Sequence, residues 1–97
     1  MKMEIKSSNN NLFISGNIKS IAHYRTIEQE VDKLINSVNN IQIHILDSIS
    51  LTSSVIGYFC KMVDNNDVAI SLFVKDENLH ELLNELNLIA LLNVRKI

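Results

Sequence analysis

The chain has 97 residues, 46% of them apolar, which is enough for one domain with one hydrophobic core. Nine basic and eleven acidic residues give a net charge of −2 and are spread along the chain, so no basic stripe marks a nucleic-acid binder. The single cysteine excludes an intrachain disulfide and a cysteine-rich zinc site, and with neither a secretory signal nor a membrane-spanning run we expect a cytoplasmic protein without membrane insertion.

The N-terminal part of the chain predicts a β-hairpin. Residues 3–6 alternate between apolar and charged side chains, and residues 12–14 form a short apolar run. Between them, residues 7–11 are all serine or asparagine, which favour turns. Gly16 and Asn17 are expected to end the second strand.

A first helix is expected over residues 26–38, because its apolar residues recur at the helical period. These residues are Ile27, Val31, Leu34, Ile35 and Val38. Acidic residues early in this stretch suit the positive end of a helix dipole. Asn39 and Asn40 are expected to end the helix.

The middle of the chain predicts a βαβ unit. Residues 41–46 read as a strand with isoleucine on one face, and a second helix carries Ile56, Phe59, Cys60 and Val63 at helical spacing. Residues 64–67 predict a turn. Residues 68–74 are almost entirely apolar, which is typical of a strand covered on both faces, and two strands joined by a helix are expected to be parallel.

Asp76 is expected to cap a third helix, whose leucines again recur at helical spacing, and residues 93–97 are expected to form a last short strand. The sequence therefore predicts one α/β domain over residues 1–97. Its order is β-β-α-β-α-β-α-β, with a mixed central sheet, made of an N-terminal hairpin plus parallel strands, and helices packed on that sheet.

The usual arrangements of catalytic or metal-binding residues are missing from the sequence. His23, His44 and His80 fall on different predicted elements without ligand spacing, and Cys60 lies on an apolar stripe with nothing basic nearby to activate it. A glycine-rich phosphate loop is also missing. We therefore expect no enzymatic activity, no metal and no cofactor.

Residues 47–54, before the second helix, are rich in hydroxyl side chains. Thr52 or Ser53 can cap that helix by accepting hydrogen bonds from its first backbone N–H groups. Capping explains one or two hydroxyls but not three in a row. An exposed hydroxyl at a helix start is also a good phosphorylation target, because the helix dipole tolerates the added negative charge. Both interpretations stay open.

The order of elements and this segment resemble the STAS domain family, which includes bacterial anti-sigma factor antagonists. The resemblance runs over nearly the whole chain. Residues 15–18, Ser-Gly-Asn-Ile, are similar to the family's turn after the second strand. Residues 52–57, Thr-Ser-Ser-Val-Ile-Gly, stand where the family has Asp-Ser-Ser-Gly-Leu-Gly, and residues 87–88 are similar to its last turn. Thr52 thus replaces an acid, and Val55 replaces a glycine.

The resemblance implies a non-enzymatic regulator that binds a serine kinase of the GHKL ATPase type, which is also an anti-sigma factor. Ser53 matches the serine that family kinases phosphorylate, and a serine phosphatase then removes the phosphate. Thr52 and Ser54 are alternative phosphate acceptors. The partner-binding residues implied are Asp47, Ser48, Thr52, Ser53, Ser54 and Gly57.

The resemblance leaves two other functions open. The first alternative is a constitutive STAS-type assembly or scaffold subunit, for example of a lipid transporter or signalling complex, which is not phosphorylated. A small-molecule sensor is the least favoured function. The family commonly continues with a C-terminal helix, which is short or missing here. We therefore expect an exposed apolar patch near the end of the chain, and a homodimer is one arrangement that would cover it.

Overall fold

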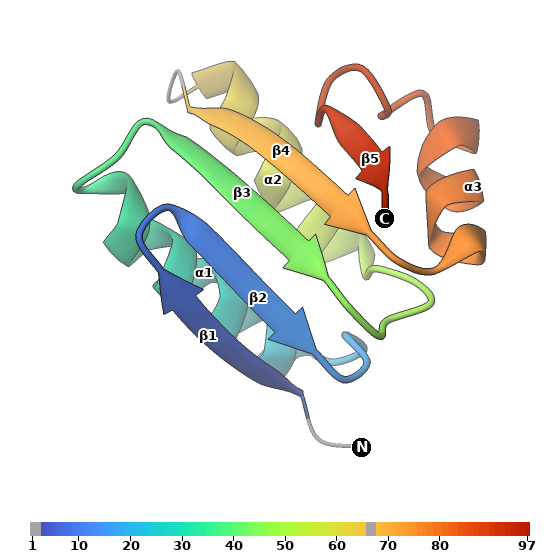
Figure 1. Cartoon of the computed structure of the whole chain (residues 1–97), viewed down its shortest axis with the longest axis horizontal. Helices are drawn as coiled ribbons and strands as arrows, with labels where there is room; N and C mark the ends of the chain where they lie inside the picture. Colours follow the sequence, from blue (N-terminus) through green and yellow to red (C-terminus); the bar gives the residue numbers. More distant parts are fainter. Residues whose placement is uncertain (1–2, 66–67) are drawn as a thin grey trace.

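The computed structural model describes residues 3–65 and 68–97. These residues form a mixed five-stranded sheet and helices in the predicted order (Figure 1). The elements are β1 (Glu4–Ser8), β2 (Asn11–Ser15), α1 (Ile21–Ile35), β3 (Asn40–Ile45), α2 (Ser53–Asn65), β4 (Ala69–Val74), α3 (Glu77–Glu85) and β5 (Val94–Lys96). The prediction of an α/β domain is confirmed. The turn predicted at residues 64–67 is wrong for residues 64–65, which still belong to α2, and residues 66–67 lie outside the described residues.

The strands lie side by side in the order β1-β2-β3-β4-β5. β1 pairs with β2 antiparallel, through a tight turn in which Asn9 has a φ of 55°, a left-handed conformation that asparagine tolerates. The other neighbouring strands pair in parallel, so the predicted hairpin and the predicted parallel pairing of β3 with β4 are both confirmed.

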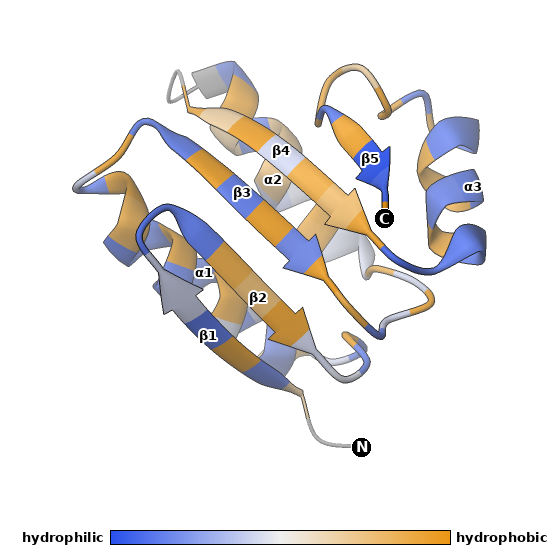
Figure 2. Cartoon of the chain, in the orientation of Figure 1, coloured by the Kyte–Doolittle hydropathy of each residue, from blue (hydrophilic) through white to orange (hydrophobic). Residues whose placement is uncertain are grey.

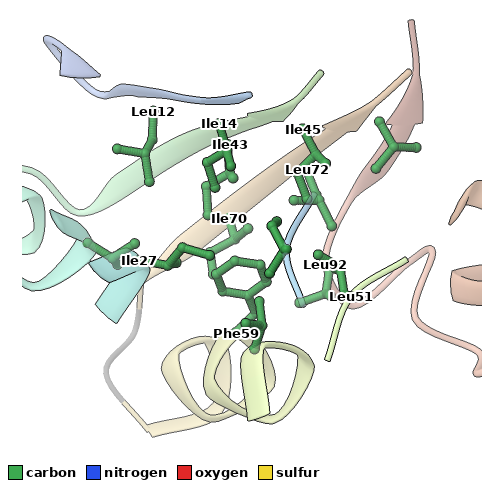
Figure 3. Packing of buried hydrophobic residues seen from close by; sticks show 14 of the residues in the cluster. Leu12, Ile14, Ile27, Ile43, Ile45, Leu51, Phe59, Ile70, Leu72 and Leu92 are labelled. Carbon is green, nitrogen blue, oxygen red and sulfur yellow. The ribbon is translucent and has the colours of Figure 1, made fainter. Parts of the chain in front are cut away.

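The core lies between the sheet and the helices. Figure 1 views the sheet from its uncovered face, with α1 and α2 behind it and α3 beside β5. Alternate residues of β2, β3 and β4 point toward the helices and are buried, and along β3 this alternation appears as orange and blue bands in Figure 2. Phe59 of α2 packs under this layer, close to Ile70 and Leu72 in Figure 3.

The predicted bounds of the first helix are wrong at both ends. α1 begins at Ile21, because the Ser20 hydroxyl caps it by accepting a 3.2 Å hydrogen bond from the His23 backbone N–H. It ends at Ile35, so Val38 lies beyond the helix. Ile27 and Val31, from the predicted stripe, are fully buried. The apolar period located the buried face of the helix, and the cap residue set its start.

Two further expectations need correction. On α2 the fully buried residues are Val55, Phe59 and Met62, while the predicted Cys60 is only half-buried at the border of that face. β4 is not covered on both faces, because Phe73 on its second face is partly exposed. That face of the sheet carries aromatic side chains, which made the strand read as completely buried.

Candidate functional site

Two loops meet where α2 begins. The Gly16 backbone N–H donates a 2.8 Å hydrogen bond to the Asp47 carboxylate, and the Ile18 N–H donates a 3.0 Å bond to the Ser48 hydroxyl. Gly16 has a φ of 82°, a left-handed conformation that favours glycine. These bonds fasten the loop after β2 to the loop after β3. We call the surface that results the α2 rim, made of Ile21, Asp47, Ile49, Thr52, Ser53, Ser54 and Gly57.

Ser48, which the resemblance implies as a partner-binding residue, lies buried beneath the rim. Ser48 is only 1% exposed, and its hydroxyl makes two hydrogen bonds within the chain. Its oxygen accepts from the Ile18 N–H, and its O–H donates a 2.6 Å hydrogen bond to the Ser50 carbonyl. Ser48 therefore holds the rim together from inside. Asp47 is exposed and remains accessible, although one of its carboxylate oxygens binds Gly16.

The three consecutive hydroxyls have different surroundings. Thr52 is the cap of α2: its hydroxyl accepts a 3.3 Å hydrogen bond from the Val55 N–H, and its carbonyl accepts from the Ile56 N–H. Capping by Thr52 was one of the two options in the sequence and is confirmed. Ser53 is the first residue of the helix and is exposed, as is Ser54.

Gly57 lies one helical turn after Ser53 and is exposed. A Cβ atom built there would meet nothing within 4 Å, so the packing of this chain does not require glycine. Glycine within a helix costs about 1 kcal/mol relative to alanine. The bare backbone at Gly57 leaves room for another molecule to approach α2 closely.

A groove between α1 and α2 opens onto the same rim. A hollow of about 550 Å³ includes Tyr24, Asp32, Ser54 and Tyr58 in its lining, and a smaller one of about 140 Å³ shares Tyr24 and Ser54 with it. The Tyr58 hydroxyl donates a 2.7 Å hydrogen bond to the Asp32 carboxylate. Burial, followed by the bond to Asp32, raises the pKa of Tyr58.

Sequence reasoning missed this groove and the apolar residues beside it. Tyr24, Glu28 and Asp32 follow one another at four-residue spacing on α1, which places them on one side of the helix. The Tyr24 hydroxyl donates a 3.3 Å hydrogen bond to the Glu28 carboxylate. This four-residue spacing is the feature of the sequence that could have indicated the polar side of α1 that lines the groove.

Ile21 is 64% exposed and shares the smaller hollow with Thr52 and Ser54, and Ile49, in the loop that leads into α2, is 58% exposed. Single exposed apolar side chains are common on protein surfaces, so these two add apolar area to the rim without marking it as a docking surface by themselves.

The remaining candidate residues stay apart. Among the residues that the structure describes, no group of three or more His, Cys, Asp or Glu side chains could hold a metal ion. Burial raises the pKa of the Cys60 thiol, followed by the effect of Asp64, which disfavours the reactive thiolate. Within residues 3–65 and 68–97, no helix has the length and apolar character to cross a membrane.

The apolar patch expected near the end of the chain stays a prediction. Leu86, Leu91 and Ile97 are exposed there.

No protein-family model matches the chain, and no curated protein matches it either. The relation to STAS domains therefore rests on the sequence resemblance and stays a prediction.

Proposed function

We propose that this protein is a STAS-type partner-switching regulator that works by binding and not by catalysis. Its α2 rim binds a serine kinase of the GHKL ATPase type, which also acts as an anti-sigma factor. Phosphorylation of Ser53 ends that binding, and a serine phosphatase restores it. The observation that carries the proposal is that Ser53 is exposed at the first position of α2, while capping falls to Thr52.

The surroundings favour Ser53 over its neighbours as the phosphate acceptor. The Thr52 hydroxyl is half-buried and bonded to the Val55 N–H. Ser54 lines the groove together with Glu28, Asp32 and Lys61, so a phosphate there would meet two carboxylates against one ammonium group. Modification of Ser53 would disturb neither the cap nor the groove.

A phosphate at this position has the energy to act as a switch. It would add a charge of about −1.5 to −2. At a helix N-terminus this charge is favourable by about 0.3–1 kcal/mol, so the fold would survive. Buried against a partner without a matching cation, the same charge would cost several kcal/mol, and each 1.4 kcal/mol weakens binding about tenfold.

The rest of the rim supplies contact area for a partner. Ile21, beside Thr52 and Ser54, and Ile49, in the loop before α2, offer exposed apolar side chains, and Gly57 permits close approach of a partner's backbone. A partner seated across these residues would cover the Ser53 hydroxyl. The rim would then couple modification of one side chain to release of the whole partner.

The test uses a GHKL kinase encoded beside this protein, with ATP and magnesium. We expect a mass increase of about 80 Da that maps to Ser53. The Ser53→Asp variant is expected to lose kinase binding at least tenfold with an unchanged melting temperature, whereas Ser37→Asp, on the exposed loop after α1, should bind normally. An unmodified Ser53, together with normal binding by Ser53→Asp, would overturn the proposal.

A constitutive assembly subunit is the second candidate. It is favoured by Thr52, which stands where the resemblance expects an acid and serves here as the helix cap. In that case Ile21 and Ile49 would belong to a permanent interface. The complex isolated from cells would then contain transporter or scaffold subunits and would not change on addition of ATP.

A further inference from the structure

A row of side chains crosses the uncovered face of the sheet, one from each strand. The strand register places them directly opposite one another in the order Lys6, Phe13, His44, Phe73 and Arg95. Along the three central strands these residues alternate with the buried ones, so their side chains lie on the face opposite the core. That face of the sheet is the one turned toward the viewer in Figure 1, away from α1 and α2. It therefore shares no residue with the α2 rim.

The three rings in this row are stacked on one another. The Phe13 and His44 ring centroids are 4.5 Å apart at 18°, and those of His44 and Phe73 are 4.7 Å apart at 10°. These distances match the spacing between strands, so the rings stand on edge, each with a face toward its neighbour. The edges of aromatic rings carry partial positive charge, and here these edges point outward.

This face is also richer in cations than the rest of the chain. Lys6 and Arg95 stand at the two ends of the row, and Lys75, directly after the end of β4, follows two residues after Phe73. Glu4, opposite Ser15, is the acidic residue that alternation places there. The face thus carries an excess of positive charge in a chain whose net charge is −2.

Sheets of parallel strands are normally covered on both faces, and β2 to β5 are parallel. We propose that this face binds an acidic amphipathic segment of a partner protein. Apolar side chains of that segment would pack on Phe13 and Phe73, and its carboxylates would meet Lys6 and Arg95. Four strand spacings separate the two cations by about 19 Å. A helix of about 13 residues spans this distance.

Charge and ring geometry argue against two other occupants. A symmetric face-to-face dimer that stacks one row on the other would bring Lys6 opposite either Lys6 or Arg95 of the second copy, so like charges would meet. Single-stranded nucleic acid binds such surfaces by stacking bases on ring faces. Here His44 takes up one face of each phenylalanine, and both of its own faces are covered. A protein segment rich in carboxylates fits this surface better.

The probe is a synthetic 15-residue amphipathic helical peptide with leucine along one face and glutamate at both ends. Its matched control has lysine at both ends. We expect the glutamate peptide to bind the full chain, measured by fluorescence anisotropy, and to shift the NMR signals of Phe13, His44 and Phe73. The lysine peptide should bind at least tenfold more weakly, because its ends would face Lys6 and Arg95.

Charge reversal tests the same contact from the side of the protein. The double variant Lys6→Glu and Arg95→Glu should bind the glutamate peptide at least tenfold more weakly than the wild type. Lys33→Glu, on α1, should bind it as the wild type does. All three positions are exposed, so the fold should tolerate these changes. Equal binding of both peptides, NMR shifts confined to α1 and α2, or tighter binding of a 15-nucleotide oligothymidine would overturn the proposal. None of these results depends on Ser53.

Discussion

The hydroxyl of Ser48 accepts a 3.0 Å hydrogen bond from the backbone N–H of Ile18, a residue 30 positions earlier in the chain. The bond is shielded from water, because both residues are buried. It connects the loop that leads into α1 with the loop that leads into α2. Together with the bond between Gly16 and Asp47, this buried contact holds the α2 rim in position.

Replacing Ser48 with alanine should leave the Ile18 N–H buried without a partner. Such a group costs about 1–3 kcal/mol. For a domain of this size, each kcal/mol lowers the melting temperature by roughly 4–8 °C. Thermal and urea unfolding would measure the loss. Ser50→Ala, at an exposed position of the same loop, is the control and should change stability by less than about 0.5 kcal/mol. Equal stability of the two variants would show that the bond is unimportant.

Thr52 caps α2 and Ser53 does not, so we expect alanine at Thr52 to lower stability and alanine at Ser53 to affect only phosphorylation. Thr52→Ala should destabilise the protein by about 1 kcal/mol, because the Val55 N–H loses its cap, and Thr52→Ser should restore the stability. Ser53→Ala should unfold like the wild type and yet resist phosphorylation. Urea unfolding of the three variants is the measurement. A destabilised Ser53→Ala together with a stable Thr52→Ala would reverse this assignment of the cap.

Local chemistry let the sequence predict the order of the elements and several of their ends. Asp76, for example, accepts hydrogen bonds from the backbone N–H groups of Asn78 and Leu79, as expected of a residue that caps a helix. Asn87 has a φ of 60°, in keeping with the turn expected there. Both features depend only on neighbours within a few residues. This is the range in which residue preferences decide the structure.

Features that depend on distant residues were not predictable in this way. The sequence marked Ser48 as one of several loop hydroxyls, and only the meeting of two loops shows that it is buried under Ile18. The stack of Phe13, His44 and Phe73 requires the register of three strands, which no local pattern specifies. The candidate site thus divides into residues recognisable by local capping and residues brought together by the fold.

Gly57 provides a test of whether the exposed face of α2 is reserved for a partner. Gly57→Ala should stabilise the protein by about 0.5–1 kcal/mol, because alanine favours a helix and its Cβ would meet nothing within 4 Å. The same methyl group would stand between α2 and a closely packed partner. We therefore expect higher stability with weaker kinase binding, measured by thermal unfolding and by titration. Kinase binding at full strength would show that the partner does not approach this position.

The stacked His44 predicts that stability falls in mild acid. Burial lowers the pKa of His44, so the folded protein disfavours the charged imidazolium that the unfolded chain accepts freely. The stability that comes from this difference is complete above the unfolded pKa, about 6.5, and is lost as the pH falls below it.

His44→Gln should show a smaller loss of unfolding free energy than the wild type between about pH 8 and pH 5, because glutamine does not titrate in this range. Urea unfolding at several pH values gives the two slopes, and an NMR titration of the ring gives the pKa directly. A pKa above 6.5 would contradict the prediction. It would mean that attraction between the imidazolium and the faces of Phe13 and Phe73 outweighs the cost of burial.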